Sequence, residues 1–177
     1  MSTAHQTVGP YWHLLEYEGW NDLLREDGPN TGMAAEAITL AGRVTDGAGA
    51  PVTDAQIEIW QAGPDGRYDG SFHGFGRART DEAGRFRFRT VKPSPVPGRG
   101  NATQAPHIQL QVFARGLLRH LTTRAYFAGE ALNGTDPLLA VVPEERRGTL
   151  IAQPGAPGEW VLDIRLRGDG ETVFLDI

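Results

Sequence analysis

The sequence predicts an all-β fold, a sandwich of antiparallel strands preceded by an N-terminal arm. Short segments alternate between apolar and polar side chains, which is the pattern of half-buried strands. Turn-forming residues separate these segments at regular spacing. The 177 residues include 23 Gly and 12 Pro, which favours many short strands over long helices. This length fits one domain, so residues 37–177 are expected to form the sandwich and residues 1–36 the arm.

The arm is apolar but follows neither a helical nor a strand period. Such a segment needs a surface to lie on. That surface is either the core of the same chain or a second chain, and the sequence leaves both open. The apolar residues concerned are Tyr11, Trp12, Leu14, Leu15, Trp20 and Leu23.

Four strands are predicted next, at 37–45, 55–61, 76–80 and 85–91. The turn DGAGAP separates the first two, and DEAG joins the last two. In the second strand Ile57 and Ile59 share one face. In the fourth, Phe86 and Phe88 point to one face, and the other face carries Arg85, Arg87 and Arg89.

Four more strands are predicted at 107–114, 119–127, 159–166 and 171–177. In the first of these, Ile108, Leu110 and Val112 fall on one face, opposite His107 and Gln109. The segment 137–153 is ambiguous, and a short helical piece is expected around PEERRGTL.

Composition excludes several classes of function. The formal net charge is −5 and no basic block stands out, so nucleic acid is not an expected partner. Without cysteine there is no disulfide, thiolate metal site or cysteine nucleophile. No uninterrupted apolar run approaches 18 residues, so no membrane span is expected. With no secretory signal either, a cytoplasmic protein is expected.

Three groups of residues are candidates for chemistry. Because residues i and i+2 of a strand project from one face, His107 and position 109 share a face, but Gln109 is a weak metal ligand. His107 alone is therefore expected to be an ordinary hydrogen-bonded histidine. Arg119, His120 and Arg124 offer cations for a carboxylate, although a solvated strand face is the simpler interpretation. The same holds for the arginines of 85–91 with Arg77 and Arg79, which acidic residues offset; these are Asp65, Asp69, Asp81 and Glu82.

Seven motifs, in this order, resemble the intradiol ring-cleavage dioxygenases and, within them, the alpha-type chains. They span nearly the whole chain. The motifs are QTVGPYWH at 6–13, GRVTDGAGAPVTDAQIEIWQA at 42–62, FGRARTDEAGRFRFRTVKP at 75–93, APHIQLQVFARG at 105–116, TTRAYF at 122–127, RRGTLIA at 146–152 and DIRLRGDGETVFLDI at 163–177. The resemblance implies a prealbumin-like sandwich.

The resemblance also implies a ferric ion, Fe(3+), held by two tyrosines and a His-x-His pair. This sequence departs from that pattern. Gln109 replaces the second histidine, Val96 replaces one tyrosine, and Gln104 stands where the family has a catalytic arginine. The loop from Tyr68 to Phe75 looks shortened where the other tyrosine would lie. Only His107 remains, so the iron is expected on a beta-type partner chain and no metal on this one.

By the same resemblance, this chain contributes Thr7, Gly9, Pro10 and Arg115 to a substrate cavity shared with the beta-type chain. Gly9 and Pro10 would form a rigid backbone wall, and Arg115 would meet the carboxylate of the substrate. The implied reaction is cleavage of protocatechuate (3,4-dihydroxybenzoate) by O2 to 3-carboxy-cis,cis-muconate, with the chain inactive alone. Catalytic residues are expected on the partner, and none on this chain.

Two other hypotheses stay open at this stage. One is a non-enzymatic β-sandwich binding module, since prealbumin-like sandwiches share the texture of GRVTDGAGAPVTDA. The other is a self-sufficient dioxygenase in which His107, His120, Tyr68 and Tyr126 gather around iron.

Overall fold

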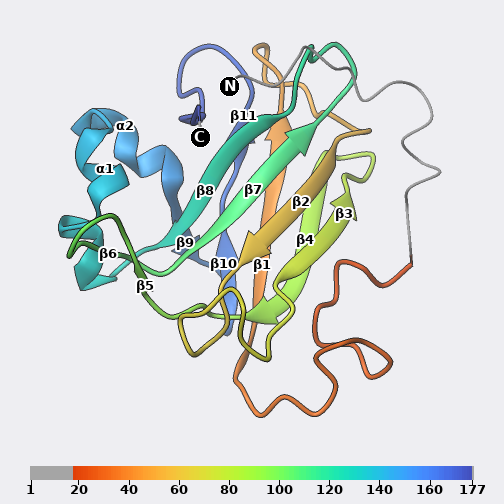
Figure 1. The fold of residues 1–177 in the computed structure, drawn as a ribbon. Helices are drawn as coiled ribbons and strands as arrows, with labels where there is room; N and C mark the ends of the chain where they lie inside the picture. Colours follow the sequence, from red (N-terminus) through yellow and green to blue (C-terminus); the bar gives the residue numbers. More distant parts are fainter. Residues whose placement is uncertain (1–17, 177) are drawn as a thin grey trace.

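The computed structural model describes residues 18–176, and strands make up most of their regular structure (Figure 1). The strands are β1 (Ala37–Thr45), β2 (Gln56–Gln61), β3 (Phe75–Arg79), β4 (Arg85–Val91), β5 (Val96–Pro97), β6 (Thr103–Gln104), β7 (His107–Phe113), β8 (Leu121–Phe127), β9 (Ile151–Pro154), β10 (Glu159–Val161) and β11 (Ile164–Arg165). The all-β prediction is confirmed, and the finer assignment to a prealbumin-like sandwich stays a prediction.

Nine of these strands form one sheet that nearly closes on itself, in the order β11-β1-β10-β9-β8-β7-β2-β3 with β4 on the free side of β1. The strands β4, β1 and β10 face β8, β7, β2 and β3 across the core, and β9 joins the two groups (Figure 1). The core lies between them because inward residues of both groups are fully buried, as for Leu40, Phe88, Ile57 and Leu110.

Alternation of side chains explains why the early strands form where the sequence predicts them. In β4 the burial alternates residue by residue, with Phe86 and Phe88 inside and Arg85, Arg87 and Arg89 exposed. A register slip of one residue would bury the three arginines, so this pattern specifies the pairing of β4 with β1. Both β1 and β4 begin and end at the predicted residues.

The predicted antiparallel pairing is wrong for three pairs of strands. β10 and β11 both pair with β1 in parallel, and β8 pairs with β9 in parallel. The predicted strand 159–166 is split between β10 and β11, because the Asp163 carboxylate accepts the backbone N–H of Arg43 at the break. Gly42 lies opposite, and a Cβ there would stand 1.9 Å from the carbonyl of Leu162.

The predicted strand at 171–177 is also wrong for its described part, 171–176. Thr172 donates its N–H to the carbonyl of Arg165 in β11, whereas Leu175 donates to the carbonyl of Thr122 in β8. The segment therefore crosses from one strand to another instead of following either, and it forms only one isolated bridge.

The described part of the arm lies on the core of its own chain. Leu23 is 2% exposed and belongs to the core cluster. Its N–H donates to Arg89 of β4, and the carbonyl of Trp20 accepts from Arg77 of β3. Residues 20–23 thus lie between the two edge strands of the sheet, β3 and β4. Tyr11, Trp12, Leu14 and Leu15 lie outside the described residues.

Short helices connect β8 to β9: η2 (Ala131–Gly134), α1 (Pro137–Val141), α2 (Glu144–Arg147) and η3 (Gly148–Leu150). The helical piece expected around PEERRGTL is confirmed. These helices cover a second apolar cluster of Ala105, Tyr126, Leu139, Val142 and Leu150. Within residues 18–176, no helix has the length and apolar character needed to cross a membrane.

Candidate functional site

The pairing of β7 with β8 brings several polar side chains together on the outer face of the sheet. His107 lies opposite Tyr126, and Gln109 lies opposite Arg124. Trp60 of β2 flanks Gln109 on the other side. The intervening residues of β7 point into the core, so this row of polar and aromatic groups faces outward as the i, i+2 pattern predicts.

His107 is held in one orientation and one tautomer. Its side chain is buried, and its Nδ1 lies 2.8 Å from the carbonyl oxygen of Ala105. A carbonyl can only accept, so Nδ1 carries the proton and Nε2 keeps its lone pair. That lone pair accepts a hydrogen bond from the Tyr68 hydroxyl at 3.3 Å. The expected role of a hydrogen-bonded strand histidine is confirmed.

Burial keeps the imidazole and the two phenols of this cluster uncharged. Desolvation, together with the smaller effect of the nearby charge of Arg124, lowers the pKa of His107 to about 4. Desolvation also raises the pKa of the Tyr68 and Tyr126 hydroxyls above the ordinary value for phenols, against the opposing effect of Arg124. At neutral pH the imidazole and both phenols are therefore neutral and the guanidinium carries the positive charge.

Arg124 links this cluster to the helical side of the molecule. Its Nη1 donates to the Gln104 side-chain carbonyl at 2.8 Å and to the Tyr126 hydroxyl at 3.3 Å. The Tyr126 hydroxyl donates in turn to Asp136 at 3.1 Å. The Nε of Arg124 is buried and has no hydrogen-bond partner among the described residues.

Asp136, which the sequence analysis did not single out, anchors the cluster. It is fully buried. Its Oδ1 accepts from the backbone N–H groups of Leu138 and Leu139 and so caps α1, while its Oδ2 accepts from Ala105 at 2.8 Å. The Asp-Pro step that places Pro137 at the start of α1 was the available signal, since Pro after an N-cap residue marks a helix start.

The cluster does not fit a metal ion. The two phenols retain their protons, Gln104 and Gln109 are neutral amides, and the guanidinium of Arg124 adds a positive charge among them. Val96, buried in β5, pairs with Gln104 and offers no ligand. Across residues 18–176 there is no group of three or more His, Cys, Asp or Glu that could hold a metal ion.

Four residues were considered together as unusual iron ligands, and the structure gathers three of them. His107, Tyr68 and Tyr126 meet, but His120 packs against Phe113 with ring centroids 5.2 Å apart, at the far end of β7. That four-residue grouping is therefore wrong. Arg119, His120 and Arg124 contact different groups: Arg119 lies 3.8 Å from Asp176, His120 packs on Phe113, and Arg124 donates to Gln104 and Tyr126.

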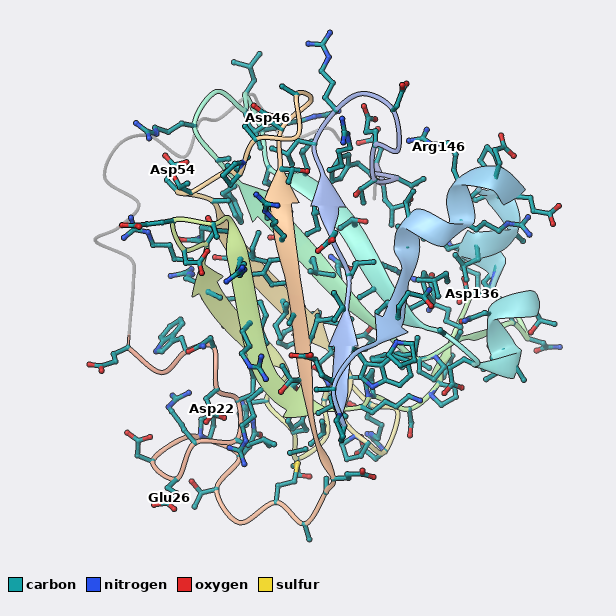
Figure 2. All side chains as sticks on the ribbon, turned by 180° about the vertical axis from the view of Figure 1, so that it is seen from behind. Asp22, Glu26, Asp46, Asp54, Asp136 and Arg146 are labelled. Atoms are coloured by element: carbon teal, nitrogen blue, oxygen red, sulfur yellow. The ribbon has the colours of Figure 1, made fainter. Side chains whose placement is uncertain are left out.

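Arg115 lies away from this cluster. It follows β7, its side chain is 72% exposed, and its Nε pairs with Asp54. Figure 2 places Asp54 and Asp136 on opposite sides of the molecule. The other residues predicted for a substrate cavity, Thr7, Gly9 and Pro10, lie outside the described residues.

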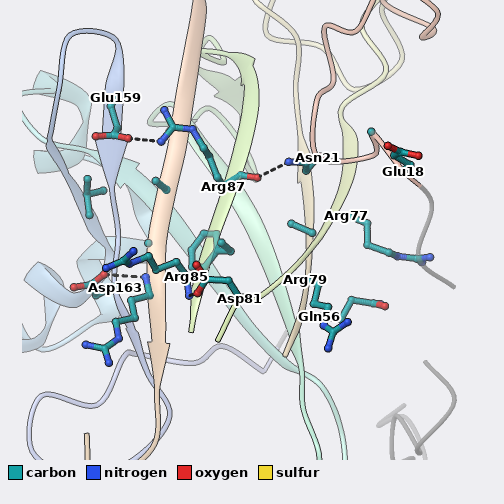
Figure 3. A pocket seen from close by; sticks show the side chains of 17 residues that line it. Glu18, Asn21, Gln56, Arg77, Arg79, Asp81, Arg85, Arg87, Glu159 and Asp163 are labelled. Atoms are coloured by element: carbon teal, nitrogen blue, oxygen red, sulfur yellow. Dashed lines mark hydrogen bonds and ion pairs between the residues drawn. The ribbon is translucent and has the colours of Figure 1, made fainter. Parts of the chain in front are cut away.

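Most of the predicted arginine group lines a groove of about 1010 Å³ along the seam between β3 and β4 (Figure 3), whereas Arg89 lies outside it and pairs with Asp22. Its cationic residues are Arg43, Arg77, Arg79, Arg85 and Arg87, and its acidic residues are Glu18, Asp81, Glu159 and Asp163. Arg87 pairs with Glu159 at 2.8 Å. Of the predicted offsetting carboxylates, Asp81 lines the groove, but Asp65, Asp69 and Glu82 do not. This near balance of charge gives the groove no clear preference for an anion.

The buried imidazole is expected to make stability depend on pH. The pKa of His107 is about 4 in the folded chain and 6.5 ordinarily, so only the unfolded chain takes up this proton between those values. The contribution of the neutral imidazole to the free energy of unfolding is complete above pH 6.5. As pH falls toward 4 this contribution is lost, which lowers the free energy of unfolding by about 3 kcal/mol. Urea denaturation from pH 4 to 7 should show this loss in the parent and not in His107→Gln. Parallel stability curves for the two proteins would contradict it.

Comparison with known proteins shows which family this chain belongs to. A dioxygenase family model matches residues 8–167. The alpha chain of protocatechuate 3,4-dioxygenase from Pseudomonas putida is 40% identical over 197 residues, covering 98% of this chain and 96% of that one. The beta chain of the enzyme from Burkholderia cepacia is 34% identical over 172 residues, covering 86% and 73%.

Among solved structures, the dioxygenase domain of a dioxygenase–carbohydrate-binding protein fusion from Streptomyces sp. SirexAA-E superposes with a TM-score of 0.66 at 29% identity. It covers 95% of this chain and 99% of that one. With matches that extend over almost the whole sequence, this chain belongs to the intradiol ring-cleavage dioxygenase family.

Proposed function

We propose that this chain is the alpha-type subunit of a protocatechuate 3,4-dioxygenase. The assembled enzyme would cleave 3,4-dihydroxybenzoate between its two hydroxyl-bearing carbons, consuming one O2 and forming 3-carboxy-cis,cis-muconate. The observation that carries the proposal is the match to an alpha chain over nearly the full length of both proteins. The iron would lie on a beta-type chain, since the cluster around His107 does not fit a metal ion.

An exposed aromatic row supports association with another chain. Phe75 and Trp60 are neighbours across β3 and β2, and the ring of Tyr68 stacks on Trp60 with centroids 6.0 Å apart. These three side chains are each about two-fifths exposed: 43% for Trp60 and 39% for each of the other two. Contiguous exposed apolar groups of this kind mark protein–protein contacts. The proposed partner is a beta-type chain in a hetero-oligomer.

In this assembly, we assign the chain's own residues to substrate binding. Arg115 would bind the substrate carboxylate, while Thr7, Gly9 and Pro10 would form one wall of the cavity. The iron supplies activation of the catechol ring toward O2 when it is bound to the partner chain. The proposal keeps the division into an arm at 1–36 and a prealbumin-like sandwich at 37–177, in a cytoplasmic enzyme.

Co-expression with the beta-type chain of the same genome tests this function. The two chains should co-purify, contain about one iron per beta-type chain, and consume O2 with protocatechuate to give a product identified by mass spectrometry. The alpha-type chain by itself should contain no stoichiometric iron and show no activity. Purification of this chain alone with iron near one per chain and ring-cleaving activity would overturn the proposal, as would the absence of a complex.

A further inference from the structure

The cluster around His107 has an arrangement of lone pairs that suits a cation. The imidazole donates its Nδ1 proton to a backbone carbonyl and turns Nε2 outward, which is how metal-binding histidines are oriented. The hydroxyl of Tyr68 meets Nε2 at 3.3 Å, and the ring of Tyr126 lies 5.6 Å from the imidazole ring. Gln109 projects from the same face two residues along β7.

A cation is already present in this cluster, on the side chain of Arg124. Its Nη1 donates to the oxygens of Gln104 and Tyr126, and its charge acts on His107 and Tyr68 as well. A guanidinium has five N–H donors, no acceptor and no accessible neutral form. It therefore occupies oxygen lone pairs of this cluster with a fixed positive charge, and it does so permanently.

We propose that Arg124 is the resident cation of this cluster and that its guanidinium keeps metal ions out. The hydrogen bonds to Gln104 and Tyr126 hold the guanidinium in place from two different strands. A divalent ion bound at His107 would stand within a few ångströms of that charge. The repulsion in protein surroundings is expected to weaken metal binding at least about 100-fold. This inference concerns the alpha-type chain alone and does not depend on the proposed function.

The experiment uses the full-length chain and cobalt(II), whose visible absorption reports coordination by protein groups. Gln109→His first adds a second imidazole on the face of His107. This variant is compared with the double variant Gln109→His/Arg124→Met, in which the charge is removed and the bulk is largely kept. The double variant Gln109→His/Arg124→Lys is a control that keeps the positive charge. Adding His107→Ala to the double variant with methionine measures how much cobalt other histidines bind. Circular dichroism verifies folding.

The double variant with methionine should bind one cobalt ion per chain at least about 100-fold more tightly than Gln109→His or the lysine variant. The addition of His107→Ala should abolish this gain. Equal binding by Gln109→His and the double variant would overturn the proposal, because the guanidinium would then exclude nothing. Binding by the folded double variant at the His107→Ala level would overturn it too. If the methionine variant fails to fold, Arg124→Gln, which keeps a donor for Gln104, provides the same comparison.

Discussion

Replacing Arg115 with alanine in the assembled enzyme is expected to lower kcat/KM for protocatechuate at least about tenfold. The substrate carboxylate must meet a cation in a partly desolvated cavity, and the proposed function assigns this contact to Arg115. Truncating one member of a buried charged pair costs about 2–5 kcal/mol, and about 1.4 kcal/mol corresponds to a factor of ten. The loss should appear mainly in KM if the contact is equally strong in the ground and transition states.

Catechol and Arg119 provide the controls for this experiment. Catechol lacks the carboxylate, so its turnover should fall much less, and the iron content of the complex should not change. Arg119 is also exposed, at 53%, and lies four residues further along, so Arg119→Ala removes a neighbouring charge without the proposed contact. Equal losses on both substrates would show that Arg115 is structural, and unchanged protocatechuate kinetics would remove its assignment to the carboxylate.

Replacing Asp136 with alanine is expected to lower the free energy of unfolding by about 3–5 kcal/mol. The carboxylate is fully buried and accepts from three backbone N–H groups and the Tyr126 hydroxyl. Losing the cap of α1 costs about 1 kcal/mol, and each buried donor left without a partner costs about 1–3 kcal/mol more. Urea denaturation followed by circular dichroism measures the change.

Asp163→Ala is the matched control for this stability measurement. Asp163 is exposed and its carboxylate accepts one backbone N–H, from Arg43, so its removal should cost about 1 kcal/mol. The loss in free energy of unfolding for Asp136→Asn should lie between those of the two alanine variants. The amide oxygen can still accept a hydrogen bond, whereas the amide NH2 would face another donor. A loss below about 1 kcal/mol in Asp136→Ala would show that the network contributes little to the fold.

The accuracy of the strand predictions depended on how far the local pattern alone specifies the structure. In 85–91 the alternation of Phe86 and Phe88 with arginines leaves one face that can be buried, and the strand forms at those residues. The segment 171–177 shows a similar alternation, but the backbone partners of its described part, 171–176, lie on two different strands. The alternation of side chains within a segment does not indicate which strands its backbone will form hydrogen bonds with.

In the candidate site, too, local sequence specifies some features and leaves others to the tertiary structure. His107 could be selected from its position in a strand. The missing ligands at Val96 and Gln109 and the missing catalytic arginine at Gln104 could be found from the family motifs. The contacts of Arg124 could not, because they depend on the register of β7 with β8 and on the approach of Gln104. The sequence grouped Arg124 with Arg119 and His120, whereas its hydrogen bonds go to Gln104 and Tyr126.

The sequence by itself determined the all-β class, the main strands, the inward and outward faces of β4 and β7, and the family. These follow from local alternation and from motifs whose order is written along the chain. Only the tertiary structure decided the parallel pairing of β10 with β1, the insertion of residues 20–23 between β3 and β4, and the meeting of His107, Tyr68 and Arg124. These features join segments far apart in the chain, and backbone hydrogen bonds can be satisfied by many partners. The arrangement adopted is the one that buries the core and satisfies its polar groups together.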